Sequence, residues 1–318
     1  MKSFNLMVGA AQVGLRLDVY LTQAGLELSR RRIRMVIDVG GVYVNDKRVR
    51  IASRLVGRGD RVRVEYSESG LKQLKTQSVY FGPQDLLLDQ DQVFALNKPP
   101  GMPAQATRDQ SIQHVVPCLE ALLKERGETR RRKLVLVHRL DKETTGVILV
   151  ADGDERATWL TDLFRKREVK KVYWAVCHGI AKEKTFTEKA FLSEIDRKTG
   201  DVRVVRSGGR SAVTHFRVLA ENPKLGLSLL ECRPETGRSH QIRVHLDVND
   251  LPIVGDKRYG SGKRGPLPES LGELSAVHHL LHARELTFRP KDGAEPLTVR
   301  ADLPERFAKF LPQAGLGQ

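Results

Sequence analysis

The feature that most constrains the fold is a change in sequence character between residues 67 and 90. This stretch contains Gln-rich patches and the pair Gly82-Pro83, and it lacks the sustained apolar periodicity of a helix or strand. It separates a short basic segment from a long segment with many apolar runs. A chain of 318 residues is long enough for one large and one small domain. We therefore expect two domains, at residues 13–66 and 91–312, joined by a linker at 67–90.

The first segment is predicted to be a small module in which helices precede a sheet. Residues 15–25 have apolar side chains at helical spacing, and Ser29 is placed to cap a second helix with the sequence RRRIRMVID. Gly40 and Gly41 are expected to end that helix. The segments VYVN, RVRI and RVRVEY that follow have the composition of β-strands separated by turns.

Positive charge is concentrated in this first segment. Lys and Arg total 54 against 39 Asp and Glu, and the formal net charge of +15 favours a polyanionic partner. A basic run is either an ordinary solvated face or a surface that contacts RNA. Because basic and apolar residues are interleaved across residues 29–64, we favour RNA contact. The residues predicted to bind RNA are Arg30, Arg31, Arg32, Arg34, Lys47 and Arg48.

The second segment mixes strands and helices without regular βαβ alternation, which predicts an α+β fold with a mixed, largely antiparallel sheet rather than a Rossmann fold. Strands are expected at 92–98, 134–137, 146–151, 172–177, 215–220, 227–234, 285–290 and 297–301. Helices are expected to end near residue 127 and to span 154–168 and 239–247.

Several functional classes are disfavoured. Cys118, Cys177 and Cys232 are far apart, so neither a disulfide framework nor a zinc site is indicated, and a reducing cytoplasm is the expected location. The start of the chain lacks the pattern of a secretory signal, and no apolar run is long enough to span a bilayer, so we expect no membrane association.

The histidines do not indicate a metal site. His278, His279 and His282, like His240 and His245, are close in sequence but lack accompanying Cys or carboxylate ligands. The chain also lacks a P-loop or dinucleotide-binding fingerprint. We expect no metal and no cofactor.

The segment VHRLDKETTGVILVA, residues 137–151, places a charged loop between two apolar strands. Asp141 is therefore near a strand end, where catalytic groups are often displayed. Arg139 and the apolar surroundings would help to keep its carboxylate ionised and dry. By spacing alone, an ordinary surface turn is equally compatible with this segment.

The string HRLD, followed after two residues by TTG and an apolar strand, closely resembles the signature of the RluA-type pseudouridine synthases. Further segments resemble motifs of that family in the same order: NKPPGMPAQ, REVKKVYWAVCHG, and RPETGRSHQIRVHL with PIVGDKRYG. In the first of these, Ala104-Gln105 replaces the family's usual His-Pro. This resemblance covers about residues 91–290. Residues 13–66 resemble the S4 RNA-binding domain through RLDVYL, SRRRIRMVIDVGGVYVNDKRV and GDRVRV.

The resemblance implies an enzyme that converts uridine in structured RNA to pseudouridine. Asp141 would then be the nucleophile or the base that starts cleavage of the glycosidic bond, and both roles stay open. Its expected ion-pair partner is Arg243, with Arg238 as second choice. Tyr173 would stack on the uracil or help to remove its C5 proton, although it could be an ordinary core aromatic.

The resemblance also implies residues that handle a nucleotide taken out of its stack. Arg139 is expected to fill the gap left by that nucleotide, or else to pair with a carboxylate. His138, Arg238 and Ile253 are also expected to bind the substrate, although for Ile253 an ordinary core role is the favoured alternative. The predicted target is large-subunit (23S) ribosomal RNA. The alternatives are tRNA, or a role as a catalytically inactive, RNA-binding ribosome assembly factor. The expected oligomeric state is a monomer.

Overall fold

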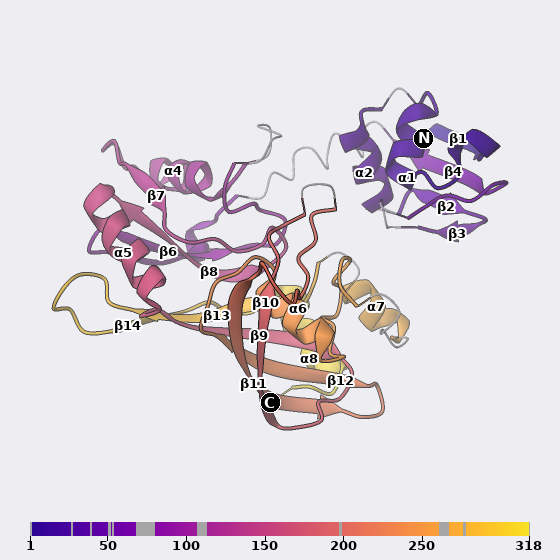
Figure 1. Ribbon diagram of the computed structural model, residues 1–318. Coiled ribbons are helices and arrows are strands. Elements are labelled where there is room, and N and C mark those ends of the chain that lie inside the picture. The colour runs from indigo at the N-terminus through magenta and orange to yellow at the C-terminus, as the bar shows by residue number, and fades with distance from the viewer. Residues whose placement is uncertain are drawn as a thin grey trace. The chain divides into compact units, whose positions relative to one another are not determined.

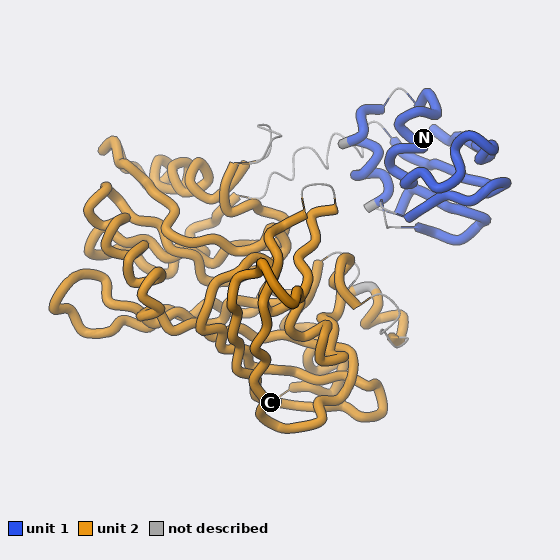
Figure 2. Tube along the Cα trace, in the orientation of Figure 1, with its two compact units in different colours: residues 1–78 blue, residues 79–318 orange. Residues whose placement is uncertain are grey.

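The computed structural model describes residues 2–26, 28–38, 40–49, 52, 54–67, 80–106, 113–196, 199–260, 267–275 and 278–317. The chain forms two compact units, residues 1–78 and 79–318, which are coloured separately in Figure 2. Each unit has its own hydrophobic core.

The first unit is an antiparallel sheet combined with two helices (Figure 1). Its strands lie in the order β1-β4-β2-β3. Leu21 and Ile33 of the two helices are buried in one core with Val62 and Val64, which alternate along β4. The elements are β1 (Lys2–Met7), η1 (Ala10–Gln12), α1 (Leu17–Gln23), α2 (Arg30–Asp38), β2 (Val42–Val44), β3 (Lys47–Arg48) and β4 (Arg61–Tyr66).

A buried carboxylate fixes the two helices of this unit. Asp18 is fully buried, and it accepts hydrogen bonds from Arg16 Nε at 3.1 Å, Arg30 Nε at 3.1 Å and Arg34 Nε at 2.7 Å. Burial alone would raise the pKa of Asp18, but the hydrogen bonds from Arg16 and Arg34 hold it below its ordinary value. Arg30 and Arg34, both predicted to bind RNA, therefore also hold the unit together.

The other predicted RNA-binding residues have different surroundings. Lys47 and Arg48 are exposed on β3, and Arg48 Nη2 donates to the Tyr43 hydroxyl at 2.9 Å. The backbone N–H of Arg32 donates to Ser29 Oγ at 3.4 Å, so Ser29 lies at the predicted capping position of α2. The side chain of Arg31 lies outside the described residues.

The second unit is built on a ten-stranded sheet in which β10-β11-β12-β9-β13-β8-β6-β5 follow one another, with β14 beside β13 and β7 beside β8 (Figure 1). Of its described strand pairs, only β8 with β13 is parallel. The predicted α+β class is therefore confirmed. The strands are β5 (Leu86–Gln90), β6 (Val93–Lys98), β7 (Leu134–Leu136), β8 (Thr145–Asp152), β9 (Lys170–His178), β10 (Thr185–Leu192), β11 (Arg210–Asn222), β12 (Leu227–Pro234), β13 (Leu281–Phe288) and β14 (Leu297–Arg300). The helical elements are η2 (Pro83–Asp85), α4 (Val115–Glu125), α5 (Asp154–Lys166), α6 (Gln241–Val248), α7 (Glu269–Ser275) and α8 (Glu305–Gln313).

Strand β8 lies between β13 and β6 in the sheet, and every residue along it is buried. Its first residues pair with β13, Thr145 with His282 and Gly146 with Ala283. Gly146 has φ +105°, and a Cβ atom there would lie 2.2 Å from the Ala283 carbonyl oxygen. The TTG sequence therefore needs its glycine because two backbones approach closely at this point.

The limits of some elements differ from those predicted. Leu86–Gln90 fall inside the predicted linker but form β5, which pairs with β6. Residues 68–79, the middle of that linker, lie outside the described residues. Strands β1 and β10 were not predicted, because neither is a continuous apolar run and exposed positions alternate with less exposed ones along both.

Candidate active site

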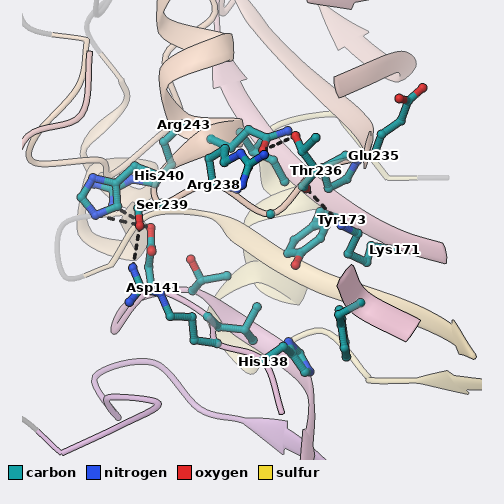
Figure 3. Close-up of a pocket in the computed structure, with 18 of the residues that line it drawn as sticks. His138, Asp141, Lys171, Tyr173, Glu235, Thr236, Arg238, Ser239, His240 and Arg243 are labelled. Carbon is teal, nitrogen blue, oxygen red and sulfur yellow. Dashed lines mark hydrogen bonds and ion pairs between the residues drawn. The ribbon is translucent and has the colours of Figure 1, made fainter. Parts of the chain in front are cut away.

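A pocket of about 610 Å³ opens on the second unit (Figure 3). Its walls come from the loop before β8, from the end of α5 and the start of β9, and from the segment that leads into α6. Of the predicted site residues, it brings together His138, Arg139, Asp141, Tyr173, Arg238 and Arg243.

The centre of the pocket is a carboxylate paired with an arginine. Asp141, in the loop between β7 and β8, accepts a hydrogen bond from Arg243 Nη1 on α6 at 2.9 Å. Arg243 also donates Nε and Nη2 to the two carboxylate oxygens of Asp256, at 2.7 and 2.9 Å. Asp256 is fully buried and 24% of the Asp141 side chain is exposed, so one carboxylate orients the arginine and the other faces the pocket.

These contacts determine the charge of Asp141. Burial would raise its pKa, but His240 and Arg243 hold the pKa below its ordinary value. Burial lowers the pKa of His240 itself, so that ring is mainly neutral near pH 7. The permanent positive charge beside Asp141 is therefore that of Arg243, whose pKa is raised further by Asp256 and Asp141 against the effect of burial.

The loop of Asp141 is held by histidines from the segment that begins β13. Thr144 Oγ1 and His279 Nε2 are 2.9 Å apart, and Thr145 Oγ1 and His282 Nδ1 are 2.8 Å apart. Glu143 forms an ion pair with His278. These histidines thus position the loop that carries Asp141.

A buried lysine supports the same loop from the NKPPG segment. Lys98 Nζ donates to the carbonyl oxygens of Pro99, Met102 and Lys142, each at 2.9 Å. Burial lowers the pKa of Lys98 to about 7, whereas the three acceptors favour its protonated form. These hydrogen bonds connect Lys142, the residue after Asp141, to Lys98 at the end of β6.

Tyr173 on β9 forms part of the pocket wall and packs against two apolar clusters. Burial, together with the charge of Asp141, raises the pKa of Tyr173 well above its ordinary value. Its phenol therefore stays protonated at neutral pH and presents a ring face and a hydroxyl to the pocket.

The two remaining arginines occupy different positions. Arg139 Nη2 donates to Ser239 Oγ at 2.5 Å and so links the loop before β8 to the segment before α6. Arg238 Nε donates to the Ser211 carbonyl oxygen at 3.1 Å. Of the two arginines considered as partners of Asp141, Arg243 therefore makes the ion pair.

The two other predicted substrate contacts, His138 and Ile253, differ in their position relative to the pocket. His138 Nε2 accepts the backbone N–H of Leu149 at 2.9 Å, its ring stacks on Phe164, and burial lowers its pKa to about 3. His138 is thus a neutral part of the pocket wall, and its Nε2 already accepts a hydrogen bond. Ile253 is 1% exposed and is not among the lining residues; it packs in the core with Ile242, which does line the pocket.

His240 and Lys171 line the pocket and were not predicted as site residues. His240 has φ 54°, its Nδ1 is 2.8 Å from the Tyr259 hydroxyl, and its Nε2 is 3.9 Å from Asp141 Oδ2. The sequence held a signal for His240, which stands in the same motif as Arg243, but it was considered there only as a metal ligand. Lys171 is two residues before Tyr173, and residues two apart on a strand face the same side of the sheet. This spacing could have placed Lys171 beside Tyr173 in the pocket.

Within the described ranges, no group of three or more His, Cys, Asp or Glu side chains is arranged to hold a metal ion. None of the helices in the part of the chain that the structure describes has the length and apolar character needed to cross a membrane.

Comparison with known proteins gives a consistent result. The sequence model for RNA pseudouridylate synthases matches residues 92–247, and that for the S4 domain matches residues 15–62. Ribosomal large subunit pseudouridine synthase D of Neisseria meningitidis serogroup A is 32% identical over 312 residues, which cover 94% of this chain and 78% of that protein. An uncharacterized RNA pseudouridine synthase of Synechocystis sp. is 31% identical over 96% of this chain and 90% of its own length. The solved structure of human RNA pseudouridylate synthase domain containing 4 superposes with a TM-score of 0.62 at 28% identity, covering 77% of this chain and 97% of that one.

The chain therefore belongs to the RluA-type family of RNA pseudouridine synthases and carries an S4 domain ahead of its catalytic domain. It is an isomerase that acts on RNA.

Proposed function

We propose that this enzyme isomerises specific uridines of large-subunit (23S) ribosomal RNA, with Asp141 as the catalytic carboxylate. The observation that carries the proposal is the chain of contacts from Asp256 through Arg243 to Asp141, which keeps one partly exposed carboxylate charged inside a pocket. The choice of RNA is supported by relatives from Neisseria meningitidis and Haemophilus influenzae that are named for the ribosomal large subunit.

The reaction breaks the bond between N1 and C1′, turns the uracil, and joins C5 to C1′. As a nucleophile, Asp141 would bond to C1′ while the N1–C1′ electron pair leaves with the uracil, and attack of C5 on C1′ would then release the carboxylate. C5 would finally lose its proton to water and N1 would take one up, so that no net proton is consumed. As a base, Asp141 would instead take a proton from the ribose to start the cleavage. Both routes require the ionised form that Arg243 stabilises, so the arrangement supports Asp141 in either role.

Tyr173 is proposed to hold the uracil while it is detached from the ribose. Its ring forms part of an apolar wall, which suits stacking on a base. Since burial raises the pKa of its phenol, a phenolate that removes the C5 proton is disfavoured at neutral pH. We therefore assign Tyr173 to binding and orientation of the base.

Arg139 is proposed to occupy the gap that a flipped uridine leaves. Its side chain is exposed at the pocket, and it donates a hydrogen bond to the uncharged hydroxyl of Ser239, a contact that RNA can replace. A guanidinium plane can stack on the neighbouring bases and bond the backbone.

The S4 domain is proposed to dock the RNA through its exposed basic residues, including Lys47 and Arg48 on β3.

We also propose that the enzyme works as a monomer in the cytoplasm. Its three cysteines are buried and form no disulfide bond with one another, which suits a reducing compartment. Sedimentation of the purified protein tests the oligomeric state, because a dimer would sediment at twice the mass.

The proposed function is tested by incubating the protein with ribosomal RNA and tRNA from cells that lack it, followed by chemical mapping of pseudouridine. We expect new pseudouridine at discrete positions of the large-subunit RNA. Modification confined to tRNA would overturn the choice of target. No modification in either RNA, from a protein that still binds RNA, would instead support an inactive assembly factor.

A further inference from the structure

Three cationic side chains gather in the part of the pocket formed by α5, β9 and the segment before α6. Lys171 is the second residue of β9, Arg167 directly follows α5, and Arg238 precedes α6. Figure 3 shows Lys171 beside Tyr173 and on the opposite side of that ring from Asp141. The cluster is therefore separate from the carboxylate that is proposed to react.

None of these cations forms an ion pair within 4.0 Å with a carboxylate of the described residues, although the charge of Arg167 contributes to lowering the pKa of Glu235. Lys171 Nζ donates one hydrogen to the Thr236 carbonyl oxygen at 3.0 Å, and Arg238 uses Nε on the Ser211 carbonyl oxygen. The carboxylates of the lining are engaged elsewhere, since Asp141 pairs with Arg243 and Glu235 is 2.7 Å from His215. The remaining N–H groups of Lys171 and Arg238 are thus available to a ligand.

The cluster is also electrostatically strained. Burial lowers the pKa of Lys171 to about 8, and the neighbouring charges of Arg167 and Arg238 contribute to that change. The pKa of Arg238 is lowered by burial and by the charges of Arg210 and Arg167. An anion bound among these groups would offset the repulsion between their positive charges. If Lys171 had only a structural role, an apolar side chain would fill this place without the cost of burying a charge.

We propose that Lys171, Arg167 and Arg238 bind a backbone phosphate of the RNA next to the target uridine. The proposal rests on the function proposed above and assigns a second, anionic part of the substrate to the pocket. Lys171 and Tyr173 lie two residues apart on one strand, so their side chains project from the same face about 7 Å apart. That separation is of the size of one nucleotide, so a base against Tyr173 would place a neighbouring phosphate near Lys171. The ammonium of Lys171 supplies a point charge, and the guanidinium groups supply forked donors that match phosphate oxygens.

The test uses an RNA hairpin that contains the mapped uridine, made with one uncharged methylphosphonate linkage at each position in turn. Binding and single-turnover pseudouridine formation are measured for the wild type and for Lys171→Met and Arg238→Met. We expect one linkage beside the uridine to weaken binding to the wild type about tenfold or more, as does Lys171→Met. The two changes together should cost no more than either alone, because they remove the same contact.

Lys170→Met is the matched control. Lys170 is exposed on the opposite face of the same strand, so its loss should leave the response to each linkage as in the wild type. Lys171→Arg should retain most of the affinity. If Lys171→Met does not fold, Arg238→Met and the exposed Arg167→Met carry the same comparison.

Equal responses of the wild type and the cluster variants to every linkage would overturn the phosphate site while leaving the synthase activity in place. Inhibition by inorganic phosphate without any effect of a neutral linkage would also overturn it, because the site would then take free phosphate. Absence of pseudouridine with every variant and RNA would instead overturn the proposed function.

Discussion

Arg243 places one guanidinium nitrogen 2.9 Å from the carboxylate of Asp141, while its other two nitrogens are held by Asp256. Because Asp256 is fully buried, it can orient the arginine without competing for the substrate. Asp141 is the more exposed of the two carboxylates and is the one that RNA can reach.

Replacing Arg243 by Met should change both the pH dependence and the stability. Without the guanidinium, the pKa of Asp141 rises, so the acidic limb of the single-turnover rate moves to higher pH. The buried charge of Asp256 also loses its partner, which should cost roughly 3–5 kcal/mol in the free energy of unfolding. Urea unfolding and a pH–rate profile measure the two effects.

The control is the double variant that also carries Asp256→Asn. Its stability should recover, but the acidic limb of its rate should stay at the higher pH. An acidic limb unchanged in both variants would contradict the assigned role.

Arg139→Ala should slow the reaction on structured RNA more than on an unpaired oligonucleotide. Only the structured substrate must be unstacked, at a cost of a few kcal/mol, so we expect a difference of about tenfold between the two substrates. The matched control is Arg165→Ala, which removes another arginine of the pocket lining, one that pairs with Asp162. Equal effects of Arg139→Ala on both substrates would argue against a role in base flipping.

The S4 domain should lose RNA affinity without losing stability when Lys47 and Arg48 are both replaced by Gln. Each lost phosphate contact reduces the slope of log Kd against log salt, so the double variant should show a slope smaller by about 1.5. By contrast, Arg34→Gln should lower the stability of the domain, because it removes a partner of the buried Asp18. A salt slope identical to that of the wild type would contradict RNA docking at β3.

Stability should fall on mild acidification, before most carboxylates titrate. Burial lowers the pKa of His279 and of His282 to about 4, whereas both take up a proton near pH 6.5 in the unfolded chain. Between these values the unfolded state binds more protons, so the free energy of unfolding decreases as pH falls from 6.5 toward 4 and levels off below that for these groups. Urea midpoints at pH 7.0 and 5.0 measure the effect, and His282→Asn should show a smaller difference between them. Equal midpoints for the wild type at both pH values would contradict this assignment.

Much of the fold could be predicted from the sequence where apolar runs are continuous and have charged or turn residues at both ends. The segments that became β8 and β12 are of this kind, and both are buried along almost their whole length. Strand β10 alternates exposed with less exposed residues and mixes Thr, Glu and Lys with Phe, so its sequence carries a weak signal.

The site could be predicted only in part, because its contacts join distant segments. Asp141 and Arg243 stand in recognisable motifs, although 102 positions separate them. The role of Asp256 as the second partner of Arg243 depends on how the segment after α6 turns back, which no local pattern encodes. For Ile253 the sequence left both a substrate contact and a core role open, because an apolar residue beside a motif can face either the pocket or the core; Ile253 is buried in the core.

Asp141→Asn separates the proposed chemical role of Asp141 from RNA binding. The amide keeps the size of the side chain but removes the charge and the basicity, so RNA binding should persist. In a single-turnover assay on the mapped ribosomal RNA fragment, with RNA affinity measured in parallel, we expect pseudouridine formation to fall by at least about 10³-fold while Kd changes little. Pseudouridine formation by the variant at the wild-type rate would contradict the account.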